Sequence, residues 1–255
     1  MILSDERRRG RAVKVTAIIQ ARMGSTRLPG KVLMDLGGKT VLARVVNRLR
    51  RATLLHEIVV ATTDSGADNA IVRECDRIGV LFFRGSENDV LDRYYQAARM
   101  CATEAVVRIT SDCPVIDSQV VDETIRAFQQ DRADYASNVF PRMYPRGLDT
   151  EVFTVAALEQ AWRDAHEPYE REHVTPYFYE HPELFRLGSP RGRIDYSRYR
   201  WTLDTAEDLE LLRTIYTRFD NRDDFSWGEV IQLMEREPGL AELNSDVAQK
   251  ALQGV

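Results

Sequence analysis

Hydrophobic and polar positions follow two patterns along the first half of the chain. Four short runs are apolar and rich in β-branched residues, which is typical of strands buried on both faces of a sheet, and they cover residues 13–20, 57–63, 80–83 and 105–110. The stretches between them place apolar residues three or four positions apart, which predicts amphipathic helices over residues 39–51, 68–77 and 90–101. This alternation predicts an α/β fold with a doubly wound, mostly parallel sheet.

The pattern loosens after residue 135. Residues 138–147 contain two prolines and a glycine, which indicates an irregular loop, and residues 148–153 alternate like a strand. The remaining predicted elements are a strand over 200–203 and helices over 154–162, 170–180 (begun or kinked by Pro176), 206–218 and 227–235. We therefore expect one domain over residues 13–240 with an inserted arm at about 138–200, between a disordered leader over residues 1–12 and a polar tail over residues 241–255.

Composition narrows the classes of function. The 255 residues are 44% hydrophobic and 29% charged and carry a net charge of −5, so we expect no nucleic-acid partner. No apolar run is long enough to span a membrane, and we expect no membrane association. The three cysteines form no C-x-x-C pair, which favours a reducing, cytoplasmic location.

The first predicted strand ends in a loop of small residues that carries Arg22, Arg27 and Lys31. Exposed backbone N–H groups and cations in such a loop can surround the negative charges of a nucleoside triphosphate, although a surface turn with solvated charges would also account for the pattern. The loop is not a Walker A motif, because Val32 follows Lys31 where that motif needs Ser or Thr. We predict that the phosphate site consists of Gln20, Ala21, Arg22, Gly24, Ser25, Arg27 and Lys31, with Arg22 and Lys31 as catalytic residues.

Polar residues also follow the other predicted strands, where the ligand of such a sheet binds. We expect Thr63, Ser86, Asp89, Arg93 and Ser111 to contact the nucleotide. Ser86 or Asp89 could accept a hydrogen bond from the exocyclic amine of a pyrimidine, with Arg93 close by. The same residues also suit the capped start of a helix.

Two acids are candidates for a metal site. Asp112 follows a buried strand and precedes Pro114, and Asp204 follows the predicted strand over 200–203. Carboxylates from two strand ends can converge on Mg²⁺ and leave positions for phosphate oxygens and water. Asp204 and Thr205 also form a good helix start, so either residue could be an N-cap instead.

The run from Gln20-Ala21-Arg22 to Arg27-Leu28-Pro29-Gly30-Lys31 resembles the signature of the sugar-acid cytidylyltransferases that activate 3-deoxy-manno-octulosonate and acylneuraminates, and is closest to the branch of spore-coat polysaccharide synthesis. The similarity covers residues 13 to about 217. It implies a Rossmann-like, GT-A-like nucleotidyltransferase fold, selection of cytosine and a homodimer that forms through the arm. It also implies that Asp112 and Asp204 bind the metal, because their surroundings match two metal-binding elements of the family except at Ser111, Cys113 and Ala206.

The loosely patterned middle of the chain is the predicted acceptor side. Arginines there could bind a carboxylate or phosphate through two hydrogen bonds, whereas the pattern favours an ordinary surface or core histidine over a general base. The candidate acceptor-binding residues are Arg142, Arg146, Asp149, Glu151, Arg171 and His173.

Together these observations predict a Mg²⁺-dependent cytidylyltransferase, whose partners are CTP and an anionic small molecule, a sugar acid or a phosphate- or phosphonate-bearing compound. Two alternatives stay open. A metal-dependent nucleotide-sugar glycosyltransferase would normally carry Asp-x-Asp, and Thr110-Ser111-Asp112 lacks the first acid. A non-catalytic nucleotide-binding module would need the phosphate loop without the two acids.

Overall fold

The computed structural model describes residues 13–190 and 194–249. Its strands form one seven-stranded sheet in the order β3-β2-β1-β4-β6-β5-β7. Their bounds are β1 Val15–Gln20, β2 Glu57–Thr63, β3 Leu81–Gly85, β4 Ala105–Thr110, β5 Tyr135–Ser137, β6 Glu151–Thr154 and β7 Leu187–Gly188. The first four strands in this order are parallel, and β6 runs antiparallel to both β4 and β5. The predicted doubly wound, mostly parallel sheet is confirmed.

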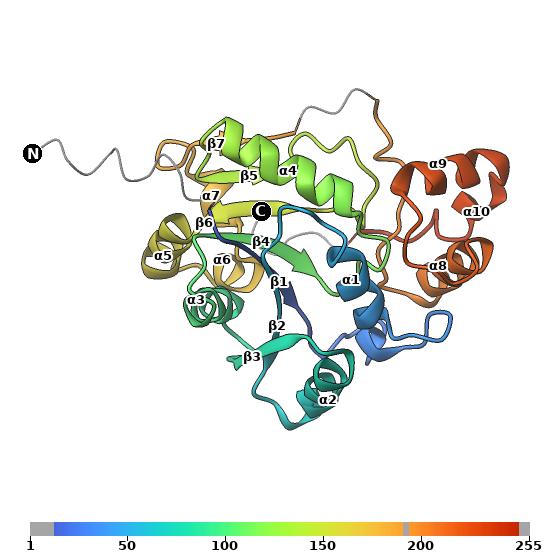
Figure 1. Cartoon of the computed structure of the whole chain (residues 1–255), viewed down its shortest axis with the longest axis horizontal. Helices are drawn as coiled ribbons and strands as arrows, with labels where there is room; N and C mark the ends of the chain where they lie inside the picture. The colour runs from blue at the N-terminus through green and yellow to red at the C-terminus, as the bar shows by residue number, and fades with distance from the viewer. Residues whose placement is uncertain (1–12, 191–193, 250–255) are drawn as a thin grey trace, which may run out of the picture.

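Helices cover both faces of the sheet (Figure 1). Their bounds are α1 Val41–Leu49, α2 Asn69–Ile78, α3 Val90–Met100, α4 Ser118–Gln130, α5 Val155–Asp164, α6 Pro168–His173, α7 Pro176–Glu180, α8 Ala206–Arg218, α9 Trp227–Arg236 and α10 Gly239–Glu242. One core joins the sheet to α1, α2 and α4, and a second core joins its other face to α3, α5 and α7. A third core packs α8, α9 and α10 beside α1, at one side of the molecule in Figure 1.

Local sequence explains where most of the longer helices begin. A side-chain oxygen just before the helix accepts a hydrogen bond from a backbone N–H of its first turn, which satisfies a donor that has no partner within the helix. The capping residues are Thr40 for α1, Asp89 for α3, Asp117 for α4, Thr154 for α5, Thr205 for α8 and Ser226 for α9.

Three parts of the arm and its surroundings differ from the predictions. The predicted strand over residues 200–203 was wrong, because the backbone N–H groups of Trp201 and Leu203 donate to two different segments, at Arg146 and Asp112. The predicted helix over 170–180 is two helices, separated at Val174, and Pro176 begins the second one as expected. Helix α4 and strands β5 and β7 had no counterpart in the sequence prediction.

The ends of the chain were predicted to be a leader and a tail. The leader over residues 1–12 lies outside the described residues. Part of the segment predicted as a tail is described, and its Asn244 is buried and donates hydrogen bonds to the Arg200 carbonyl oxygen and to Asp208. Among the described residues, no helix has the length and apolar character needed to cross a membrane.

Candidate active site

The loop after β1 is held in one shape by its own backbone. Met23 O accepts hydrogen bonds from the N–H groups of Ser25 and Gly30, and Met23 N donates to Asp68. Gly30 has a φ of 70°, a left-handed conformation that favours glycine, and it precedes the short 3₁₀-helix Lys31–Leu33. This turn directs Lys31 back across the ends of the strands.

Lys31 lies at the centre of a charge cluster. Its Nζ donates to Asp112 Oδ2 at 2.6 Å, to Asp204 Oδ1 at 2.8 Å and to the carbonyl oxygen of Leu203 at 2.6 Å. Burial acts to lower the pKa of Lys31, but the charges of Asp112 and Asp204 outweigh it and the pKa is raised. Lys31 is therefore a charged, nearly buried cation that joins the loop after β1 to the residues after β4.

Asp204 forms ion pairs with two further cations. Arg27 Nη2 lies 2.9 Å and Arg200 Nη2 lies 2.6 Å from its Oδ2. Burial acts to raise the pKa of Asp204, but Lys31 and these arginines lower it below its ordinary value. Thr205 is the N-cap of α8, in a capping box with Asp208, so capping is the role of Thr205 and not of Asp204.

Asp112 and Asp204, the two predicted metal ligands, converge on the point that Lys31 Nζ occupies. The oxygens of Asp112, Asp204 and Leu203 around that point are the kind of ligand that Mg²⁺ prefers. Among the described residues no group of three or more His, Cys, Asp or Glu side chains could hold a metal ion, so Mg²⁺ would take the rest of its ligands from phosphate and water. The residues fit Mg²⁺ if Lys31 moves aside.

Cys113, which stands where the resemblance implies an acid, is not a third metal ligand in this arrangement. Its Sγ lies 3.2 Å from Thr110 Oγ1 and 3.6 Å from Asp112 Oδ1. Burial, with the nearby charges of Asp112 and Asp149, raises the pKa of this thiol well above its ordinary value. A thiol that stays protonated is a poor metal ligand and a poor nucleophile.

The predicted nucleotide residues lie along the ends of β1, β2 and β3. Arg22 is half exposed and 3.9 Å from Glu87, so it is available to a ligand. Arg93 is buried and donates to the carbonyl oxygen of Ser86. Among the described residues, Arg93 Nε and Gln20 Oε1 are buried without a hydrogen-bond partner.

Other predicted nucleotide residues have structural tasks. Asp89 caps α3 and forms an ion pair of 2.5 Å with Arg171. Ser86 Oγ accepts from the N–H of Asp89 in the same turn, as the capped-helix alternative predicted. Thr63 Oγ1 donates to Asp68, and Ser111 N donates to the carbonyl oxygen of Gln20.

The predicted acceptor residues do not form one cluster. Arg142 makes a two-pronged ion pair with Asp149, at 2.6 and 2.8 Å. Glu151 is buried in β6, where it binds Arg108 and the hydroxyl of Tyr135. Arg146 lies beside Arg200 and within reach of the charges of Arg142 and Asp149, whereas Arg171 and His173 lie apart in α6.

Two residues of the site were missed in the sequence. Asp68 accepts hydrogen bonds from Met23, Thr62 and Thr63, which fixes the loop after β1 against β2. Arg200 joins Asp204 to Asp208. Neither follows a strand end in the predicted pattern, so no periodicity or motif could have identified them.

Comparisons with known proteins show the family. The profile of a family described as cytidylyltransferase matches residues 16–250. The spore coat polysaccharide biosynthesis protein SpsF of Bacillus subtilis is 37% identical, over 88% of this chain and 95% of that protein. A 3-deoxy-manno-octulosonate cytidylyltransferase of Geobacter sulfurreducens is 36% identical over 48% of each chain.

A solved structure shows the same architecture. The structure of a cytidylyltransferase from Leptospira borgpetersenii superposes with a TM-score of 0.86 and 36% identity, over 94% of this chain and all of that one. The resemblance read from residues 20–31 is thereby confirmed.

Proposed function

Because the chain belongs to the cytidylyltransferase family, we propose that it transfers CMP from CTP to an acidic small-molecule acceptor and releases pyrophosphate. An acceptor oxygen forms a bond to the α-phosphorus, and the bond from that phosphorus to the bridging oxygen breaks. The electron pair leaves with pyrophosphate and the acceptor proton leaves to solvent. Transfer of this kind depends on charge neutralisation and geometry more than on covalent catalysis.

The observation that carries this proposal is the convergence of Lys31, Asp112 and Asp204. Lys31 comes from the loop after β1, Asp112 follows β4 and Asp204 precedes α8, yet Lys31 Nζ lies 2.6 Å from an oxygen of Asp112 and 2.8 Å from an oxygen of Asp204. A buried cation between two acids at the carboxyl ends of parallel strands is suited to a multiply charged phosphate substrate with its metal ion.

Mg²⁺ would be held by Asp112 and Asp204, and when bound it would neutralise charge on the triphosphate. Because Lys31 Nζ occupies the space between the two acids, we propose that it moves aside when Mg²⁺ binds there. We therefore assign Lys31 two positions, one between the acids and one on a phosphate oxygen of CTP. Arg22, which is half exposed, would bind another phosphate.

The acceptor proposal rests on relatives. SpsF is named for spore coat polysaccharide biosynthesis, and the Geobacter enzyme is named for 3-deoxy-manno-octulosonate. The similarity to the second covers about half of this chain, so it supports CTP use more than it supports that particular sugar acid.

Pyrophosphate release tests the proposal. The protein is incubated with Mg²⁺, each of the four nucleoside triphosphates in turn and a panel of sugar acids, sugar phosphates and phosphonates. Release with CTP and at least one acidic acceptor is expected. CTP binding without pyrophosphate release from any acceptor would contradict transfer and favour a nucleotide-binding module.

A further inference from the structure

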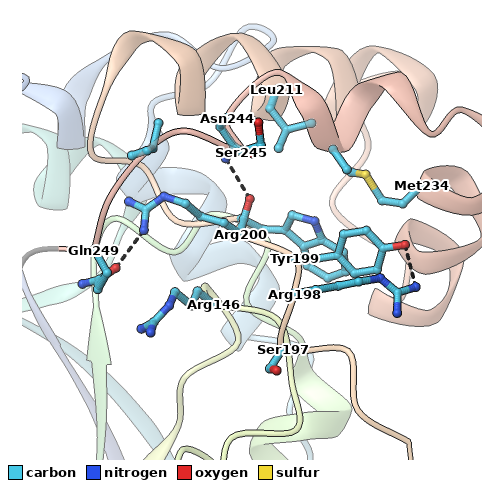
Figure 2. Close-up of a pocket in the computed structure, with 13 residues that line it drawn as sticks. Arg146, Ser197, Arg198, Tyr199, Arg200, Leu211, Met234, Asn244, Ser245 and Gln249 are labelled. Atoms are coloured by element: carbon cyan, nitrogen blue, oxygen red, sulfur yellow. Dashed lines mark hydrogen bonds between the residues drawn. The ribbon is translucent and has the colours of Figure 1, made fainter.

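A cavity of about 280 Å³ lies beside the charge cluster, and of its lining residues the sequence analysis had predicted only Arg146 as part of a site (Figure 2). This volume is near the small end of the range for ligand pockets, roughly 300–1,000 Å³, so the cavity suits a small molecule. Its described lining includes three arginines and no acid: Arg146, Ser197, Arg198, Tyr199, Arg200, Trp201, Leu211, Met234, Ala241, Asn244, Ser245, Val247 and Gln249. An anion would balance this charge.

Two of the three arginines already have partners. Arg198 lies over the ring of Tyr199 and donates to its hydroxyl at 3.0 Å. Arg200 binds Asp204, Asp208 and the side-chain oxygen of Gln249. Figure 2 accordingly draws dashed lines from these two residues and none from Arg146.

Arg146 is the cation that remains. Among the described residues no hydrogen bond or ion pair reaches its guanidinium group. Partial burial and the positive charges of Arg142 and Arg200 lower its pKa, and together they outweigh the negative charge of Asp149, which acts to raise it. A partly buried guanidinium beside like charges gains most from a bound anion.

The backbone holds Arg146 in place without using its side chain. Arg146 N donates to the carbonyl oxygen of Tyr199 at 3.0 Å, and Trp201 N donates to the carbonyl oxygen of Arg146 at 2.7 Å. Gly147 follows with a φ of 104°, and a Cβ there would lie 2.6 Å from the Trp201 carbonyl carbon. The backbone of Arg146 is therefore fixed beside Tyr199 and Trp201, and its side chain starts from a defined position in the cavity lining.

The cavity adjoins the transfer site through Arg200, which lines the cavity and also contacts Asp204. Its opposite wall comes from the C-terminal segment, where Ser245 and Gln249 supply a hydroxyl and an amide. Such groups can hydrogen-bond the hydroxyls of a polyol.

We propose that this cavity is the acceptor site, that its ligand is a small polyhydroxylated molecule bearing one carboxylate or phosphate, and that Arg146 binds that anion. This inference rests on the proposed CMP transfer. It assigns to Arg146 alone the binding of the anion, which the sequence analysis had shared among Arg142, Arg146, Arg171 and three other residues.

Calorimetric titration of the full chain tests the inference with three probes: gluconate, glycerol phosphate and uncharged sorbitol. We expect at least one anionic probe to bind and sorbitol to bind more weakly than either. Replacing Arg146 by Gln should lower the affinity for the anionic probe about tenfold or more, because a hydrogen bond between charged groups is lost. Arg146→Lys keeps a positive charge and should retain part of that affinity.

The control is Arg163→Gln, which removes an exposed arginine whose one ion pair among the described residues is with its neighbour Asp164. Arg163→Gln should leave the affinity for the anionic probe unchanged, and Arg146→Gln should leave the affinity for CTP unchanged, which also shows that the variant is folded. Equal anion affinity in the wild type and Arg146→Gln, or no binding of either anion up to its solubility limit, would overturn the inference.

The two proposals can fail separately. If the wild type releases pyrophosphate from CTP and Arg146→Gln keeps the acceptor KM of the wild type, transfer stands and the cavity is not the acceptor site. If the anionic probe binds through Arg146 but no nucleotide yields pyrophosphate, transfer fails and the acceptor role of the cavity is overturned with it.

Discussion

Replacing Lys31 by Met is the sharpest test of the charge cluster. Met has a similar length and no charge, so the change removes the ammonium group from between Asp112 and Asp204. Asp204 keeps Arg27 and Arg200, but Asp112 loses the only ion pair that the described residues give it. The main cost therefore falls on Asp112.

The size of the effect follows from this geometry. A hydrogen bond to a charged group contributes about 1.5–3 kcal/mol, and the Asp112 side chain is 23% exposed, so we expect a loss of about 2 kcal/mol. For a chain of this length that lowers Tm by about 4–8 °C. A divalent cation no longer has to displace Lys31, so its affinity without nucleotide should rise about thirtyfold, the equivalent of 2 kcal/mol.

Two measurements check these values in the absence of nucleotide: thermal unfolding with and without Mg²⁺, and Mn²⁺ binding by electron paramagnetic resonance. Mg²⁺ should raise the Tm of Lys31→Met and change that of the wild type much less. Lys39→Met is the matched control, because Lys39 is exposed and pairs with Asp223 away from the cluster. If the wild type binds Mn²⁺ as tightly as Lys31→Met, then Lys31 and the metal do not share oxygens and the reasoning is refuted.

Four further predictions concern the charge cluster and the cavity beside it. Asp112→Asn and Asp204→Asn should each raise the Mg²⁺ concentration needed for half-maximal pyrophosphate release. Because Thr205 and not Asp204 caps α8, a change in Tm of Asp204→Asn with unaltered metal dependence would contradict the assignment of Asp204 as a metal ligand. The pKa of Asp204 is lowered in the folded protein, so its contribution to stability is complete above the ordinary value of 3.8 and is lost as pH falls through the folded pKa. Asp204→Asn should therefore flatten the acid side of a plot of Tm against pH. An acid side as steep as that of the wild type would contradict this prediction. The raised pKa of Lys31 acts in the opposite sense, with stability complete below 10.5 and lost as pH rises through the folded value, so Lys31→Met should flatten the alkaline side in the same melts. Gly147→Ala should lower the free energy of unfolding in urea by about 1–3 kcal/mol or more, because φ is 104° and the new Cβ would contact the Trp201 backbone. The control is Gly38→Ala, where φ is 84° and a Cβ meets open space, so that it measures the cost of the backbone conformation alone. Equal losses at the two sites would mean that the contact with Trp201 costs nothing.

The sequence alone determined the parts of this protein that depend on neighbouring residues. Buried parallel strands are continuous apolar runs, so β1, β2 and β4 were predicted within two residues of their ends. Helix caps such as Thr154 and Thr205 act within one turn, and the signature loop is a contiguous motif. The family and the edge of the sheet that carries the candidate site could both be predicted from these local signals.

Only the tertiary structure decided which charges are paired. Lys31 and Asp204 are 173 positions apart, and nothing in their local sequence indicates that they form an ion pair. Arg142 and Arg146 are equivalent candidates in the sequence, yet Arg142 is neutralised by Asp149 while Arg146 faces a cavity. Ion pairs and cavities arise when segments distant in the chain pack together, so the acceptor side could be assigned only once that packing was known.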